Sequence, residues 1–104
     1  MNNATTILEK SKVSYGDFIT QLNGNNEKIE FESSIFEVGL VLNTGERIII
    51  EKDIVFKQCD FATLDFVKCD FKKSVHFHAC TFIKGPVITN CNFASRFIAN
   101  HLKA

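Results

Sequence analysis

The sequence predicts a small, mainly β domain in which short strands coil around a central axis behind an N-terminal helix. The first observation is a five-residue spacing of phenylalanine, at Phe56, Phe61, Phe66 and Phe71. Five residues match neither the 3.6-residue period of a helix nor the two-residue period of a straight strand, so either structure would expose about half of these rings. All of the rings can face inward if the chain turns a corner about every five residues.

Two further observations support this coil. A second column of mostly apolar residues precedes the aromatic column by two positions and contains Ile54, Cys59, Leu64, Cys69, Val75, Cys80 and Cys91. Like residues also recur at one longer spacing, since Phe61 and Phe82 are 21 residues apart and Phe71 and Phe93 are 22 apart. Such a recurrence is expected of coils that stack and bury their cores against one another.

Residues 1–24 are predicted to form a helical cap. Leu8, Tyr15, Phe18, Ile19 and Leu22 follow a spacing of three and four residues. The pair Asn23-Gly24 predicts the end of the helix, and Gly16 allows a division into two helices. We expect this segment to close one end of the coil, and a partner-binding helix is the alternative.

Residues 28–53 are predicted to form strands and a hairpin. Phe31, Phe36 and Val41 repeat the five-residue spacing, which is consistent with a degenerate first coil. The stretch LVLNTGERIII predicts a hairpin that turns at residues 43–45.

Residues 54–98 contain the repeats, which read CDFAT, LDFVK, CDFKK, CTFIK and CNFAS. They resemble the pentapeptide-repeat family, whose motif is a small residue, then Asp or Asn, then Leu or Phe, then two freer positions. The resemblance implies a right-handed, four-sided β-helix with both columns pointing inward. The sequence departs from the motif where cysteine replaces the usual alanine, where HFHACTF carries an extra residue, and in GPVITN.

The whole chain, residues 1–104, is predicted to be a single domain. Residues 95–104 are expected to form a C-terminal cap, as a short helix that packs Phe97, Ile98 and Leu102. The start of the chain lacks an apolar stretch of secretory length, and no apolar run reaches the length of a membrane span. We therefore expect a cytoplasmic protein that does not enter a membrane.

The residues of the repeat favour structural roles over catalysis. The four cysteines lack a C-x-x-C pair and are predicted to be buried free thiols, with a disulfide between stacked cysteines and a metal site as the alternatives. Asp60, Asp65 and Asp70 are expected to bond backbone N–H groups at corners. No phosphate-binding loop, nucleophile elbow or zinc-protease motif occurs. We expect no enzyme activity, no metal and no cofactor.

The candidate binding residues occupy outward positions of the repeat: Lys57, Lys68, Lys72, Lys73, Lys84, His76 and His78. Net charge is zero, but residues 1–53 carry five Lys/Arg and nine Asp/Glu, a balance of −4, whereas residues 54–104 carry seven and three, a balance of +4. This asymmetry points to surfaces that differ in the partners they attract. Complementary charge within one fold is the alternative for the asymmetry. Ordinary solvation is the alternative for the lysines, and His76 and His78 are expected to be surface histidines.

These observations favour a non-catalytic protein that binds a macromolecule, either a protein or a ribonucleoprotein. The resemblance implies a function like that of pentapeptide-repeat inhibitors and protectors of DNA-acting enzymes. A small phage- or bacterium-encoded inhibitor of a nucleic-acid-processing complex, such as an anti-CRISPR protein, is one such function. Direct RNA or DNA binding through the lysines is the first alternative. An oligomerisation module that forms a homodimer through a coil end is the second.

Overall fold

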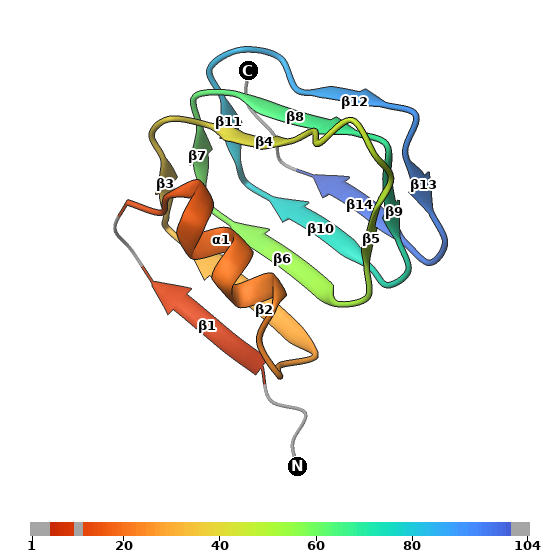
Figure 1. Ribbon diagram of the computed structural model, residues 1–104. Helices are drawn as coiled ribbons and strands as arrows, with labels where there is room; N and C mark the ends of the chain where they lie inside the picture. Colours follow the sequence, from red (N-terminus) through yellow and green to blue (C-terminus); the bar gives the residue numbers. More distant parts are fainter. Residues whose placement is uncertain (1–4, 10–11, 101–104) are drawn as a thin grey trace.

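Three turns of short parallel strands stack along one axis, and the one helix among the described residues is short and lies where the coil begins (Figure 1). This computed structural model describes residues 5–9 and 12–100. The first turn comprises β2 (Lys28–Glu32), β3 (Ile35–Phe36), β4 (Leu40–Leu42) and β5 (Ile48–Ile50). The second comprises β6 (Asp53–Lys57), β7 (Asp60–Phe61), β8 (Leu64–Val67) and β9 (Cys69–Phe71). The third comprises β10 (Val75–His78), β11 (Thr81–Phe82), β12 (Val87–Thr89) and β13 (Asn92–Phe93), and β14 (Phe97–Asn100) follows it.

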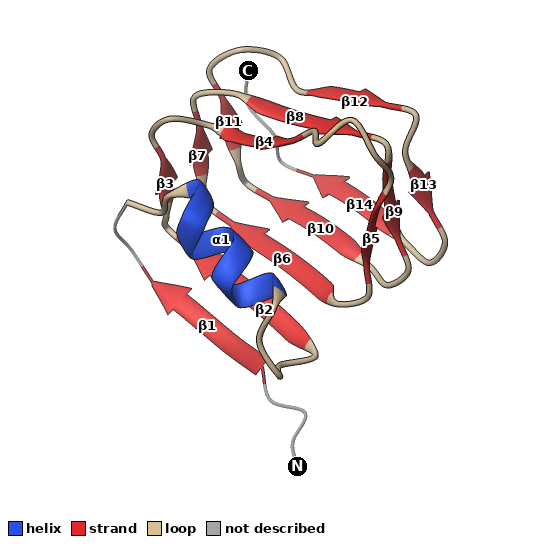
Figure 2. Cartoon of the chain, in the orientation of Figure 1, coloured by secondary structure: helices blue, strands red, loops and turns tan. Residues whose placement is uncertain are grey.

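Each side of the coil is a parallel sheet, so the coil has four faces (Figure 2). The first face has the strand order β1-β2-β6-β10-β14, where β1 spans Thr5–Glu9. The second face contains β3, β7 and β11, the third β4, β8 and β12, and the fourth β5, β9 and β13. Every one of these strand pairs is parallel. The predicted β-solenoid and its degenerate first coil are therefore confirmed.

The aromatic column forms stacked ladders inside the coil. On the first face, the ring of Phe56 lies 5.3 Å from that of Phe31 and 4.9 Å from that of Phe77, with interplanar angles of 11°. On the second face, Phe61 stacks on Phe36 at 4.7 Å and on Phe82 at 5.3 Å. Rings of the two ladders meet edge to face, which is a favourable arrangement for aromatic quadrupoles.

The second inward column also behaves as the spacing predicts. Ile29, Ile54 and Val75 stack on the first face and are all buried. On the second face the column begins with Ser34, which is buried and donates its hydroxyl hydrogen bond to the Glu32 carbonyl. Satisfying this donor lets a polar side chain occupy an interior position without the cost of an unpaired group.

Two of the four corners use left-handed backbone. Residues with φ between 52° and 58° follow β2, β6, β8, β10 and β12, and they are Ser33, Gln58, Lys68, Ala79 and Asn90. None of them is β-branched, which fits the steric cost of this region for branched side chains. The strain recurs at corresponding positions of successive turns, so it is part of the repeat rather than a local irregularity.

Among the described residues, the helical prediction for residues 1–24 is correct only for the second half of that segment, and residues 1–4 and 10–11 lie outside the described residues. The helix α1 spans Tyr15–Leu22, with Ser14 and Asp17 forming a capping box at its start and Asn23 at its end. It is continuous through Gly16. Residues 5–9 instead form β1, an edge strand paired with β2. Phe18 is fully buried and its ring stacks 5.7 Å from that of Phe31, so α1 closes the first end of the coil as expected.

The predicted hairpin at residues 40–50 is wrong. β4 pairs with β8 and β5 pairs with β9, so these strands lie on adjacent faces, and the loop between them is an insertion at a corner. Val41 is also 41% exposed, because one extra residue precedes β4 and places Leu40 and Leu42 inside. Gly39 makes that extra residue acceptable: its φ is 87°, and a Cβ there would lie 2.9 Å from Thr63.

Two expectations for the later part of the chain also need correction. Phe97–Asn100 is strand β14, paired with β10, where we expected a helix, and Ile98 points outward while Ala99 takes the aromatic register of Phe77. Leu102 lies outside the described residues. Asp60, Asp65 and Asp70 occupy outward positions within strands, and among the described residues none of them accepts a hydrogen bond from a backbone N–H group at a corner.

We expect Phe71→Ala to lower the free energy of unfolding by about 3–5 kcal/mol. Phe71 is 1% exposed and its ring stacks 5.1 Å from that of Phe93, so truncation leaves a cavity inside a ladder. The neighbouring Lys72 is exposed, and Lys72→Ala should change stability by no more than about 0.5 kcal/mol. Urea denaturation of both variants measures the difference, and similar effects would contradict this register.

Candidate functional site

The predicted binding residues are distributed around the coil. Lys57 ends β6 on the first face, Lys68 lies at the corner before β9, and Lys84 lies in the loop between β11 and β12. Lys72 and Lys73 form the corner before β10. The five lysines therefore occupy all four corner regions, and the fold does not gather them on one face.

Three cations that precede the third turn are paired with carboxylates. Arg47 lies 2.6 Å from Asp70, Lys57 lies 3.2 Å from Glu30, and Lys12 lies 3.4 Å from Glu37. Lys68 instead reaches the Gly45 carbonyl, at 3.5 Å. These contacts reduce the charge that the first two turns present to a partner.

Asp70 is the centre of one such arrangement on the fourth face. Its Oδ1 accepts hydrogen bonds from Arg47 at 2.6 Å and from the side-chain amide of Asn92 at 2.9 Å. Desolvation opposes the charged form, but the bonds from Asn92 and Arg47 outweigh it and lower the pKa of Asp70. This carboxylate therefore favours its ionised form and connects three successive turns, since Arg47 precedes β5, Asp70 lies in β9 and Asn92 lies in β13.

The third turn differs because it has cations without carboxylates. Residues 71–100 contain four basic residues and no Asp or Glu. We call Lys72, Lys73, Lys84 and Arg96 the basic set. All four are exposed, and none makes an ion pair within the described part of the chain. Sequence reasoning missed Arg96, although the run of thirty residues without an acid was visible in the sequence.

His76 and His78 both point outward from β10 on the first face. The His78 Nδ1 lies 2.7 Å from the Asn100 side-chain oxygen, which links β10 to β14. His76 lines a hollow of about 250 Å³ together with Lys28, Asp53 and Arg96. Its Nε2 atom is buried and has no hydrogen-bond partner among the described residues. Of the two histidines, His76 is thus the one with an unused polar atom.

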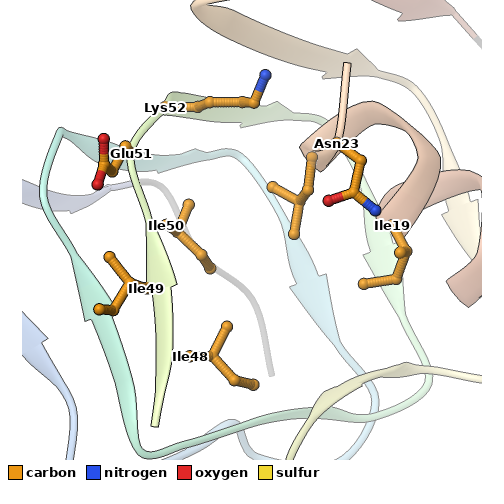
Figure 3. Close-up of a pocket in the computed structure, with 8 residues that line it drawn as sticks. Ile19, Asn23, Ile48, Ile49, Ile50, Glu51 and Lys52 are labelled. Carbon is orange, nitrogen blue, oxygen red and sulfur yellow. The ribbon is translucent and has the colours of Figure 1, made fainter. Parts of the chain in front are cut away.

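A second hollow, of about 180 Å³, lies between α1 and β5 (Figure 3). Ile19 and Ile48 form part of its apolar lining, and Ile49 beside them is 58% exposed. At its edge the Lys52 ammonium donates to the Gly24 carbonyl at 2.7 Å and to two oxygens of Asn26 at 2.6 Å. Burial lowers the pKa of Lys52. Its bonds fasten the segment after the helix to the coil, so Lys52 has a structural role.

The cysteines are free thiols, and three of the four are buried. Cys59 and Cys80 are stacked on the second face, and Cys69 and Cys91 on the fourth. Hydrogen bonding to the Cys80 sulfur, and then burial, raise the pKa of Cys59. Burial, and then the Cys91 sulfur, raise the pKa of Cys69 to about 12. Cys91 itself is only half-buried, because it belongs to the last turn.

Comparisons with known proteins find no relative: no family model matches the sequence, no curated protein matches it, and no solved structure matches the fold. The solenoid architecture therefore rests on the strand pairing itself. Within the described residues, no cluster of three or more His, Cys, Asp or Glu side chains is arranged to hold a metal ion. Over the same residues, no helix has the length and apolar character that crossing a bilayer requires.

We expect Cys91 to react first with a thiol reagent in the native protein. The thiolate is the reactive form, and burial blocks access to Cys59, Cys69 and Cys80, so these three should react much more slowly. The raised pKa values of Cys59 and Cys69 also keep those two thiols protonated, whereas hydrogen bonding with Cys59 lowers the pKa of Cys80, so Cys80 is protected by burial alone. All four should react rapidly in urea. Iodoacetamide labelling followed by mass spectrometry measures the order, and a fast native reaction at Cys59 or Cys80 would show that their column is not enclosed.

Cys69 should also make stability fall at alkaline pH. The folded thiol keeps its proton up to a pKa of about 12, whereas an unfolded thiol loses it near about 8.5. The folded state binds more protons in this interval, so the contribution of Cys69 is complete below about pH 8.5 and is lost as the pH rises toward 12. Urea denaturation from pH 8 to 10.5 should show a steeper decline for the wild type than for Cys69→Ala, and parallel declines would contradict the shift.

Proposed function

We propose that this is a non-catalytic binding protein that uses its third turn to engage an acidic macromolecular partner, either a protein or a ribonucleoprotein. The observation that carries the proposal is the basic set. Its four cations are exposed, have no ion-pair partner among the described residues, and belong to a stretch without a single carboxylate. Unneutralised charge of one sign attracts a partner of the opposite sign and accelerates its association.

The solenoid gives these cations a fixed spacing. Lys72 and Lys73 follow β9, whose Phe71 is stacked on Phe93, and the backbone N–H of Lys72 donates to the Ile50 carbonyl at 2.8 Å. Arg96 precedes β14, and its carbonyl accepts from the Val75 N–H at 2.8 Å. Charges held on an ordered backbone lose less conformational entropy on binding than charges on a flexible tail.

The more specific part of the proposal concerns family and biological role. The quintets CDFAT, LDFVK and CDFKK, with their in-register inward phenylalanines, support membership of the pentapeptide-repeat family. A cytoplasmic inhibitor of a bacterial nucleic-acid-processing complex, encoded by a phage or a bacterium and of the anti-CRISPR type, is the role we propose within it. The net charge of the third turn argues against imitation of DNA by that surface, because DNA is a polyanion.

An acidic protein surface fits the third turn better than bare nucleic acid. Among the described residues after β11, the exposed large apolar side chains are three aliphatic residues, Ile83, Val87 and Ile88, and a single aromatic ring, that of Phe97. Sequence-tolerant nucleic-acid binders rely on exposed aromatic platforms for base stacking, together with grooves that follow the phosphate backbone. Four cations are also fewer than the roughly six to ten phosphate contacts of strongly salt-dependent DNA binders.

Charge reversal tests the proposal. The quadruple variant Lys72→Glu, Lys73→Glu, Lys84→Glu and Arg96→Glu should stay folded, because all four side chains are exposed. Capture from bacterial lysate should retain its partner after nuclease treatment with the wild type and lose it with this variant. For the purified partner, association should slow by at least about tenfold and lose its salt dependence.

The matched control reverses four exposed acids of the first half. Glu27→Lys, Glu37→Lys, Glu46→Lys and Glu51→Lys change the charge by the same amount in the opposite sense. This control should keep the partner. If the acidic variant loses the partner and the basic-set variant keeps it, the first half is the working surface and the proposal is wrong. Capture that disappears with nuclease would assign the cations to nucleic acid instead.

A further inference from the structure

The two ends of the coil are finished differently. At the first end, Phe18 of α1 covers the ladder at Phe31 and is itself fully buried. At the other end, the interior residues Ile88 and Phe97 remain 39% and 41% exposed. Within the described residues, no element lies over them as α1 lies over Phe31. The interior of the solenoid therefore reaches the surface at its C-terminal end.

A hollow of about 180 Å³ opens at this end. Every residue that lines it is apolar: Leu64, Phe77, Phe82, Pro86, Ile88, Phe97 and Ala99. Its volume is below the range of about 300–1,000 Å³ that is typical for pockets holding drug-sized ligands. The size therefore favours a single large apolar side chain over a cofactor or a metabolite.

Unpaired strand edges lie at this end of the coil, and two cations lie within two residues of side chains that line the hollow. β11, β12, β13 and β14 are each the last strand of their sheet, so each has one edge without a pairing strand in the described chain. Such edges can pair with an added extended segment. Lys84 lies in the loop between β11 and β12, and Arg96 lies directly before β14. Residues 71–100 contain no carboxylate, and Asp53, which lines the hollow beside His76 together with Arg96, makes no ion pair with it in the described part of the chain.

We propose that the C-terminal end of the coil is a docking site for an extended acidic protein segment that inserts one large apolar side chain into this hollow. The inserted side chain would cover Ile88 and Phe97, and flanking carboxylates would face Lys84 and Arg96. The inference rests on the proposed function, because it names the part of the acidic partner that the third turn receives. Ile88 is the central residue of the proposed site, because it lies in register with the inward Phe66 of the second turn and also lines the hollow.

A second copy of the chain fits this end less well. Two C-terminal ends facing each other would bring two basic sets together, and like charges in an interface are unfavourable. A head-to-tail arrangement would place the hollow against an end that α1 already covers. An acidic segment from another protein meets neither obstacle.

A peptide titration tests the docking site directly. The probe is the acetylated and amidated heptapeptide DEDFDED, added to the ¹⁵N-labelled full chain and followed by two-dimensional NMR. We expect saturable shifts of the backbone amides of Ile88, Phe97 and Ala99. The peptide DEDADED should bind at least tenfold more weakly, and KRKFKRK should not bind. The proposal would be overturned if DEDFDED caused no saturable shift, or if the shifts were confined to the hollow between α1 and β5.

Variants separate the hollow from general charge attraction. Ile88→Asp should weaken DEDFDED at least tenfold, whereas Val38→Asp, at a residue that is 77% exposed in the first turn, should leave binding unchanged. Arg96→Glu provides a second test that does not alter the apolar lining, and it should also weaken binding. The amide dispersion of each spectrum shows whether the variant is folded. Equal binding by wild type, Ile88→Asp and Arg96→Glu would overturn the proposal.

If the hollow is instead occupied by a second copy or by the end of this chain, the following results would show it and would contradict the docking proposal. Concentration-dependent dimerisation in analytical ultracentrifugation, abolished by Ile88→Asp, would assign the hollow to a second copy. Binding of DEDFDED only after removal of residues 101–104 would assign it to the end of this chain. If the lysate partner depends on the basic set but not on Ile88, the docking inference fails while the proposed function stands. If the peptide binds but no partner depends on the basic set, the proposed function fails.

Discussion

The structure depends on in-register stacking of side chains between successive turns. Phe56 lies between Phe31 and Phe77, and Phe61 lies between Phe36 and Phe82, each with nearly parallel rings. A shift of one residue in any strand would turn its inward side chains to the solvent, because strand side chains alternate between faces. Each turn therefore imposes its register on the next, and the corners must absorb every difference in length.

This constraint leads to an asymmetry between the two ends. A stacked ladder cannot cover its own last member, so a solenoid needs separate elements at its ends. Here Phe18 extends the ladder of the first face from a helix, with its ring 5.7 Å from that of Phe31. No described residue plays the same part beyond Phe97. The same end carries the cations without ion-pair partners, so apolar exposure and unneutralised charge occur together in the third turn.

Much of the coil could be predicted from the sequence, because the five-residue spacing of the phenylalanines shows directly which side chains point inward. The predictions failed where the longer-range pairing overrode a local pattern. Residues 5–9 continue the helical spacing of Leu22 and Phe18, yet they pair with β2 at the edge of a sheet. Leu40–Ile50 has the pattern of a hairpin, but both strands find in-register partners in the second turn. Residues 97–100 likewise extend a sheet, because β10 offers them an open edge.

The candidate surface was harder to predict, because an outward position can lie on any of four faces. Spacing alone placed Lys57, Lys68 and Lys84 in one group, although they lie at different corners. What separates them is their neighbours in the adjacent turn, which are remote in sequence: Glu30 pairs with Lys57, and the Gly45 carbonyl lies near Lys68. The third turn has no following turn of strands to supply such partners. Its cations make no ion pair among the described residues, and a macromolecule bound there would take the place of that missing neighbour.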